Sequence, residues 1–399
     1  RREIQWNNCN RCLYGNLPPI IVVIGAISFL PSVLTTHAQS DNCVPSRFAS
    51  QWSNTDFCNT SLDDFSSIIS GGPGRDGIPA VDNPAMDTIE EASEWLVAQS
   101  PVIAVEIEGE ARAYPQALLM WHEIANDEIG GVPVAVTFCP LCNSSIVFDR
   151  RVGDDTLTFG VSGNLRNSDM VMFDRETESW WQQFTGEGIV GDNNGVLLDI
   201  IPSQVIGFGQ FAEQYPDGLV MNRDTGFNRQ YGVNPYVGLD DSRGGVTSLF
   251  TGEYDERLPA RERVLAGEVD GVYMAYPFST LSEEIVINDT LGETEVVAFW
   301  QPGVFSSLDE RTIDESQDVG TAALFNRTLE DGTVLTFTWD ADAQVLLDDQ
   351  TGSSWNLFGE ATEGELAGTE LQQLVAAPHY WFAWAVFEPE TVVYGVDDE

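Results

Sequence analysis

Two cysteines separated by two residues are the side chains in this sequence best suited to metal or redox chemistry. Cys139 and Cys142 lie in the run FCPLCNSS, where a proline follows the first cysteine. A tight turn of this kind can aim two sulfurs at one ion, which supplies half of a tetrahedral zinc or copper site. The same pair could act as a catalytic dithiol, or serve as a structural disulfide or as buried thiols. The sequence leaves these interpretations open.

A metal site would need further ligands, and the sequence offers few imidazoles. Apart from His37 near the start of the chain, the histidines are His122 and His379. The predicted metal ligands are therefore His122, Cys139, Cys142 and His379, with copper or zinc as the ion and Glu123 as an outer partner. If the centre works by thiol chemistry, Cys139 and Cys142 are the catalytic residues. Each histidine would also suit a core position with one hydrogen bond.

A second group of candidates lies in the segment 162–184, where charged residues alternate with apolar ones. Paired Arg and carboxylate side chains beside Trp can bind a carboxylate or a sugar-like molecule. The alternative is a salt-bridge network that only closes the fold. The predicted ligand-binding residues are Arg166, Asp169, Arg175, Glu178 and Trp181.

The scaffold that must position these residues occurs twice in the sequence. ARAYPQALLMWHEIANDEIGGVPVAVTFCP, from Ala111, is matched by YMAYPFSTLSEEIVINDTLGETEVVAFWQP, from Tyr273, at a constant offset. At that offset His122 corresponds to Glu284, and Cys139 corresponds to Gln301. We expect residues shared by both copies to serve the fold, whereas residues found only in the first copy are candidates for chemistry.

Each copy is predicted to contain a hairpin, one helix and several further strands. In the first copy we expect a hairpin over 102–114, a helix over 115–129 and a strand over 132–138. In the second copy the helix is expected over 277–287. The predicted fold is β-rich α+β, with two tandem homologous repeats packed as a pseudo-twofold pair.

The repeats divide the chain into five expected segments. Three arginines precede the apolar run 18–34, and small residues follow it at 36–38, which is typical of a cleaved signal peptide; an uncleaved anchor is the alternative. The segments are a signal peptide (1–38), an irregular lead-in with a Cys43–Cys58 disulfide (39–95), repeat 1 with the candidate site (96–220), a connecting segment (221–256) and repeat 2, a degenerate copy (257–399).

The composition limits the partners. The chain has 63 acidic and 18 basic residues, a formal charge of -45 that repels nucleic acid and anionic membrane surfaces. Its 11 Trp, 21 Phe and 10 Tyr exclude a disordered acidic protein. We therefore expect a small molecule or a metal ion as partner, no nucleic acid and no stable membrane span after signal cleavage. The expected location is extracytoplasmic, either periplasmic or secreted.

Three longer motifs carry a resemblance to a known family. WHEIANDEIGGVPVAVTFCPLCNSSIVFDR and FGVSGNLRNSDMVMFDRETESWWQQ closely resemble the bacterial family called domain of unknown function 3179, and HYWFAWAVFEPET resembles its closing motif. The resemblance covers roughly residues 95–395. It implies an exported or envelope-associated protein without an established activity. It also implies a centre in which Cys139 and His122 are the constant pair, because position 142 can hold another residue.

The predicted function is an exported protein with a metal or thiol redox centre in repeat 1. The alternative is a non-catalytic extracytoplasmic binding module for a small polar ligand, in which the cysteines are purely structural. Whether the protein is an enzyme stays open at this point.

Overall fold

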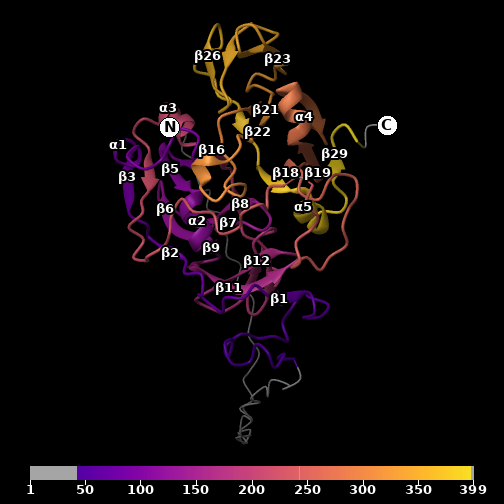
Figure 1. Cartoon of the computed structure of the whole chain (residues 1–399). Coiled ribbons are helices and arrows are strands. Elements are labelled where there is room, and N and C mark those ends of the chain that lie inside the picture. The colour runs from indigo at the N-terminus through magenta and orange to yellow at the C-terminus, as the bar shows by residue number, and fades with distance from the viewer. Residues whose placement is uncertain (1–42, 242, 397–399) are drawn as a thin grey trace, which may run out of the picture. The chain divides into compact units, whose positions relative to one another are not determined.

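The computed structural model describes residues 43–241 and 243–396. The predicted signal peptide, residues 1–38, lies outside the described residues. The described chain is rich in strands, with short helices beside them (Figure 1). This confirms the predicted β-rich α+β class. No described helix has both the length and the apolar content that crossing a membrane requires.

The first half of the fold opens with two hairpins joined by one short helix. β4 (Pro101–Ile107) pairs with β5 (Glu110–Pro115), which confirms the predicted hairpin. β6 (Ile124–Ile129) pairs with β7 (Val132–Cys139), and α2 (Gln116–His122) connects the two hairpins. Since β7 ends at Cys139, this framework delivers the first cysteine of the candidate site.

The predicted helix over 115–129 is wrong in its second half. Glu123 adopts a left-handed backbone with φ of 59°, which ends α2, and the residues after it form β6. Gly130 and Gly131 do not end a helix; both have positive φ and form the two-residue turn between β6 and β7. Asn126 and Asp127 are buried in β6, so the strand lacks the apolar alternation that would have identified it.

The rest of the first half adds several strands, as predicted, and a helix that the sequence analysis did not predict. β8 extends the β6–β7 sheet, and β11 to β14 form a second antiparallel sheet. The elements are β8 (Ser144–Asp149), β9 (Arg151–Val152), β10 (Asp155–Thr156), β11 (Phe159–Arg166), β12 (Asp169–Asp174), β13 (Trp180–Gln182), β14 (Gly188–Val190), β15 (Ile200–Ile201), β16 (Gln204–Gly207), α3 (Phe208–Gln214) and β17 (Leu219–Met221).

The lead-in segment is fastened to the first half by short strands. β1 (Ile68–Ser70) pairs with β11, β2 (Val81–Asp82) pairs with β6, and β3 (Met86–Thr88) pairs with β17 and precedes α1 (Ile89–Ala92). The predicted disulfide joins Cys43 to Cys58. Because these strands complete the sheets of the first half, the lead-in is part of the same folded unit.

The second half follows the same order of elements. Those from β18 to β21 have the same lengths as those from β4 to β7, namely seven, six, seven, six and eight residues. The elements are β18 (Arg263–Val269), β19 (Val272–Pro277), α4 (Phe278–Glu284), β20 (Val286–Leu291), β21 (Thr294–Gln301), η1 (Ile313–Glu315), β22 (Thr321–Asn326), β23 (Phe337–Asp340), β24 (Val345–Asp348), β25 (Ser354–Trp355), β26 (Ala361–Glu363), β27 (Gln372–Gln373), β28 (Ala376–Tyr380), α5 (Trp381–Phe387) and β29 (Val392–Val393).

The predicted helix over 277–287 is also too long. Ile285 ends α4 with φ of 67°, in the position that Glu123 occupies after α2. A positive φ is unfavourable for a β-branched residue, so the fold itself imposes this backbone shape in both halves. α3 and α5 add a second helix to each half, where one had been expected. Between Met221 and Arg263 the described residues form no helix or strand beyond an isolated bridge at Val233.

Several polar residues that both halves share have structural roles. The Tyr114 hydroxyl donates to Asp127 (2.7 Å), as Tyr276 donates to Asp289 (2.9 Å). The buried guanidinium of Arg150 donates to three backbone carbonyls, and Arg327 donates to the matching three. The acceptors are Val134, Leu157 and Asp127 for Arg150, and Val296, Leu335 and Asp289 for Arg327. These contacts tie the sheets of each half together.

We predict that Arg150→Leu lowers the free energy of unfolding by about 3 kcal/mol, because three buried carbonyls lose a charged donor. Arg151→Leu is the matched control, since Arg151 is more than half exposed and pairs only with Asp149. It should change stability by less than about 0.5 kcal/mol. Urea unfolding followed by Trp fluorescence measures both, and equal losses for the two variants would contradict this role for Arg150.

Candidate metal centre

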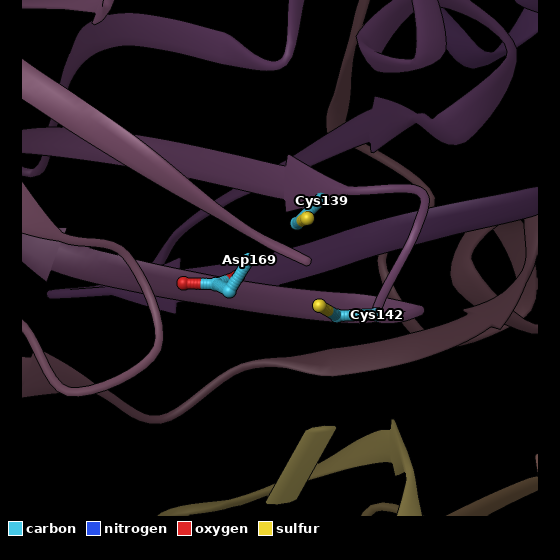
Figure 2. Close-up of side chains that lie close together, drawn as sticks. All are labelled: Cys139, Cys142 and Asp169. Atoms are coloured by element: carbon cyan, nitrogen blue, oxygen red, sulfur yellow. The ribbon is translucent and has the colours of Figure 1, made fainter. Parts of the chain in front are cut away.

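The side chains of Cys139, Cys142 and Asp169 meet in the interior of the first half. The two sulfurs and a carboxylate oxygen lie within 4.8 Å of one another, and all three residues are buried. Figure 2 shows the Cys142 sulfur directed toward the other two side chains. Among the described residues this is the single group of three or more such donors close enough to share an ion. We call it the Cys2Asp cluster.

Two hairpin turns bring these donors together. Cys139 is the last residue of β7, and Cys142 follows in the turn before β8, where its N–H donates to the Cys139 carbonyl (3.3 Å). Asp169 is the first residue of β12, after the tight turn of Asn167 and Ser168. The Cys139 thiol donates to the Ser168 carbonyl (3.7 Å), so the two turns are in direct contact.

Asp169 is held in the core by two hydrogen bonds to a single oxygen. Its Oδ2 accepts from the Gln182 side chain (2.6 Å) and from the Phe184 N–H (3.0 Å). Its Oδ1 is buried without a hydrogen-bond partner. A buried carboxylate oxygen without a partner is costly, and it is available to a cation.

The electrostatics of the cluster disfavour negative charge. Burial raises the pKa of Asp169 to about 7, and burial with Asp169 close by raises the pKa of Glu123 to about 8. Burial also raises the pKa of both thiols, most strongly that of Cys142. Among the described residues no arginine pairs with Asp169 or Glu123. Among the described residues, four acidic groups therefore share a buried region without a cation directly paired to them.

The connecting segment 221–256 contacts this region from outside the first half. Thr251 donates to Asn167 (3.0 Å), and the Thr247 and Ser168 hydroxyls are hydrogen-bonded, so both residues of the Asp169 turn are held. Burial, with Glu123 and Cys139 nearby, raises the pKa of the Tyr236 phenol. The segment thus covers the cluster as well as linking the halves.

His122 lies outside the Cys2Asp cluster, with both ring nitrogens engaged elsewhere. Nδ1 donates to the Pro79 carbonyl (2.7 Å), so Nε2 accepts from the Tyr231 hydroxyl (2.7 Å). The imidazole is fully buried, and burial lowers its pKa. The structure therefore gives His122 the contacts of a satisfied core histidine, with no position beside the two sulfurs.

His379 also lies outside the cluster, although it is close in the fold. It belongs to β28, and the N–H of the next residue, Tyr380, donates to the Cys142 carbonyl (2.9 Å). Its ring packs against Phe184 and Trp384, and burial lowers its pKa to about 3, which keeps it neutral. Its Nδ1 has no hydrogen-bond partner.

The structure separates the five predicted ligand-binding residues. Asp169 belongs to the Cys2Asp cluster, and Arg166 lines a large cavity. Arg175 pairs with Asp82 (2.9 Å), and Glu178 pairs with Arg75 (3.0 Å). Trp181 is fully buried and donates its indole N–H to Asp174 (2.8 Å), a contact that Trp355 and Asp348 repeat in the second half (3.0 Å).

The buried polar side chains around the cluster occur in the first half alone. Gln182 binds Asp169, and Gln183 donates to Thr137 (2.8 Å), while the Gln183 carbonyl oxygen is buried without a partner. These two glutamines were missed as site residues, although the duplicated sequence held the signal. Glu123, Thr137, Cys139, Asp169, Gln182 and Gln183 correspond by position to Ile285, Phe299, Gln301, Ala343, Asn356 and Leu357.

Comparison with known proteins yields one match. The family model described as "Protein of unknown function (DUF3179)" matches residues 75–391. No curated protein and no solved structure matches the chain.

We predict that the metal-free protein loses stability as the pH rises from 5 to 9. Because the folded-state pKa of Glu123 is raised to about 8, its stabilising contribution is complete below the unfolded pKa near 4.5 and is lost as the pH passes 8. Glu123→Gln should flatten this dependence by a few kcal/mol, whereas the exposed control Glu128→Gln should not. Urea unfolding across this pH range, with chelator present, measures the slopes. Identical slopes for wild type and Glu123→Gln would refute the assignment.

Proposed function

The chain belongs to the family described as protein of unknown function (DUF3179), and we propose that it binds a metal ion through Cys139, Cys142 and Asp169. The observation that carries the proposal is the mutual approach of two sulfurs and a carboxylate oxygen to within 4.8 Å in a buried site. An ion would supply the positive charge that these acidic groups lack, and it would favour their deprotonated forms.

Zinc fits this set of donors better than copper does. Two sulfurs alone would suit a soft ion such as copper. Asp169 adds a hard oxygen donor, which zinc accepts readily beside thiolates. Three protein donors leave the fourth tetrahedral position for water or a substrate, and the buried Glu123 carboxyl interacts electrostatically with Asp169.

Thiol redox chemistry is the second candidate, supported by the closeness of the two free cysteines. A reactive dithiol needs a lowered thiol pKa, because the thiolate is the nucleophile. Burial raises the pKa of Cys139 and Cys142 instead. Without a metal ion, the environment therefore favours protonated, unreactive thiols over a catalytic dithiol.

We further propose that the two halves are a tandem duplication packed about a pseudo-twofold axis, with the centre kept in repeat 1. The equal element lengths from β4 to β7 and from β18 to β21 support it, as do the repeated contacts of Arg150 and Arg327. Corresponding strands of the two halves make contacts across the boundary between them in both directions. β28 meets the Cys142 turn of the first half, and Thr321 of β22 donates to the Val205 carbonyl in β16.

We expect wild-type protein, reconstituted with zinc after thiol reduction and desalted, to retain one zinc ion per chain. Cys139→Ser and Asp169→Asn should each weaken zinc binding about tenfold to hundredfold or more, because each removes a donor. His122→Gln is the control, since its imidazole is engaged by Pro79 and Tyr231. Competition with a chromophoric chelator gives the affinities, and elemental analysis gives the stoichiometry.

Different results would separate the candidate functions. Absence of stoichiometric zinc and copper from the wild type would contradict the metal centre. Reversible loss of two titratable thiols on mild oxidation, without bound metal, would favour the dithiol. Zinc loss in His122→Gln, with Asp169→Asn unchanged, would restore the ligand set predicted from the sequence.

We also propose that the protein is exported, with residues 1–38 as its signal peptide. The Cys43–Cys58 disulfide is compatible with an oxidising compartment outside the cytoplasm. The expected mature chain begins at Gln39. N-terminal sequencing of protein secreted or released from the periplasm tests this, and full-length chain retained in the cytoplasm would contradict it.

A further inference from the structure

A cavity of about 730 Å³ lies between the two halves, next to the Cys2Asp cluster. The first half contributes Arg166 and Phe184, and the second half contributes His379 and the end of α5. The volume falls in the range of small-molecule sites. Phe184 links the cavity to the cluster, because its side chain lines the cavity while its N–H donates to Asp169.

Arg166 is the one basic side chain among the described residues that line this cavity. With the described residues it forms no ion pair, and its one hydrogen bond to them is a long one to Gln182 (3.4 Å). The guanidinium carries five N–H donors in a planar fork that matches a carboxylate. Since Arg166 is also partly buried, most of its hydrogen-bonding capacity is left for a ligand.

His379 supplies a second unsatisfied polar group on the same cavity. The residue is 2% exposed, and its Nδ1 is buried without a partner. Around it lie aromatic rings: Phe184 stacks on Phe387 at 5.1 Å, and Trp384 stacks on the imidazole at 5.4 Å. Arg166 lies over the Phe387 ring at 5.4 Å. The Arg166 guanidinium therefore lies against the end of a row of packed aromatic side chains.

The carboxylates that line the cavity do not pair with Arg166. Glu268 and Glu388 interact with the Tyr273 hydroxyl, and burial raises the pKa of Glu388 to about 7, which reduces its charge. Glu187 and Asp199 also line the cavity, and among the described residues neither forms an ion pair with Arg166. A ligand with an anionic group at Arg166 and a hydroxyl near Tyr273 would match both ends.

The second half provides an internal comparison. The corresponding hollow, beside α3 and Phe358, has a volume of about 340 Å³. Its polar lining consists of amides, a hydroxyl and acids, including Gln210, Glu213 and Glu360, and among the described residues it has no arginine or histidine. The pairing of β16 and β28 with their hairpins places Ile206 where the first cavity has His379. The cationic and imidazole groups are thus particular to one of two related hollows.

From this arrangement we infer that the cavity binds a small organic acid with an aromatic or apolar body, whose carboxylate is held by Arg166. Phe184, Trp384 and Phe387 would cover the apolar body, with the His379 ring packed among them. The cavity lining does not include the proposed metal ligands, and the inference does not depend on a bound ion.

The test uses isothermal titration calorimetry on the metal-free protein with phenylacetate, 4-hydroxyphenylacetate and indole-3-acetate, each compared with its neutral amide. At least one acid should bind roughly tenfold or more tightly than its amide, because the charge-assisted pair with Arg166 is lost in the amide. Arg166→Gln should abolish that preference. Arg166→Lys should retain part of it, because lysine keeps the charge without the fork.

Arg175→Gln is the matched control, since Arg175 pairs with Asp82 away from the cavity lining and should leave binding unchanged. Because the titrations use metal-free protein, a failure of the metal proposal is distinguishable from a failure here. Equal binding of acid and amide by wild type, or no binding of any acid at millimolar concentration, overturns the inference. Preferential binding of benzyltrimethylammonium also overturns it, because the glutamates would then select a cation.

Discussion

The pair of hydrogen bonds that hold the Asp169 carboxylate in the core organises the candidate site. Gln182 and the Phe184 N–H both bind Oδ2, so the carboxylate remains beside two thiols although burial disfavours its charge. These bonds connect β12 to β13 and to the residues beyond it, one of which lines the large cavity. The cluster, its polar support and the cavity are therefore one connected arrangement.

The framework contacts that recur in the two halves explain how such an unfavourable cluster is tolerated. Arg150 and Arg327 satisfy equivalent carbonyls, and Asp174 and Asp348 cap equivalent indoles, so each half has its own buried polar supports. The second half carries apolar or neutral residues at the cluster positions, including Ile285 for Glu123 and Ala343 for Asp169. The fold does not require those acids, which is why their presence in the first half points to binding or chemistry.

Local patterns identified the apolar strand β7 well and the polar buried strand β6 poorly. The β4–β5 hairpin and the Cys43–Cys58 disulfide were predictable from short-range signals. The helix over 115–129 was extended too far, because a left-handed Glu123 is not encoded by any local preference and Asn126 is buried in a strand. Tertiary contacts outweighed propensity at both places.

The sequence by itself determined the family, the duplicated scaffold pattern and the importance of Cys139, Cys142, Asp169 and Arg166 as candidates. It paired the cysteines with His122 because histidine is the usual partner by residue type. Only the tertiary structure decided that Asp169 meets the sulfurs, that His122 is occupied by Pro79 and Tyr231, and that Arg166 faces a separate cavity. Composition specifies which donors exist, whereas strand register and turn packing specify which of them converge.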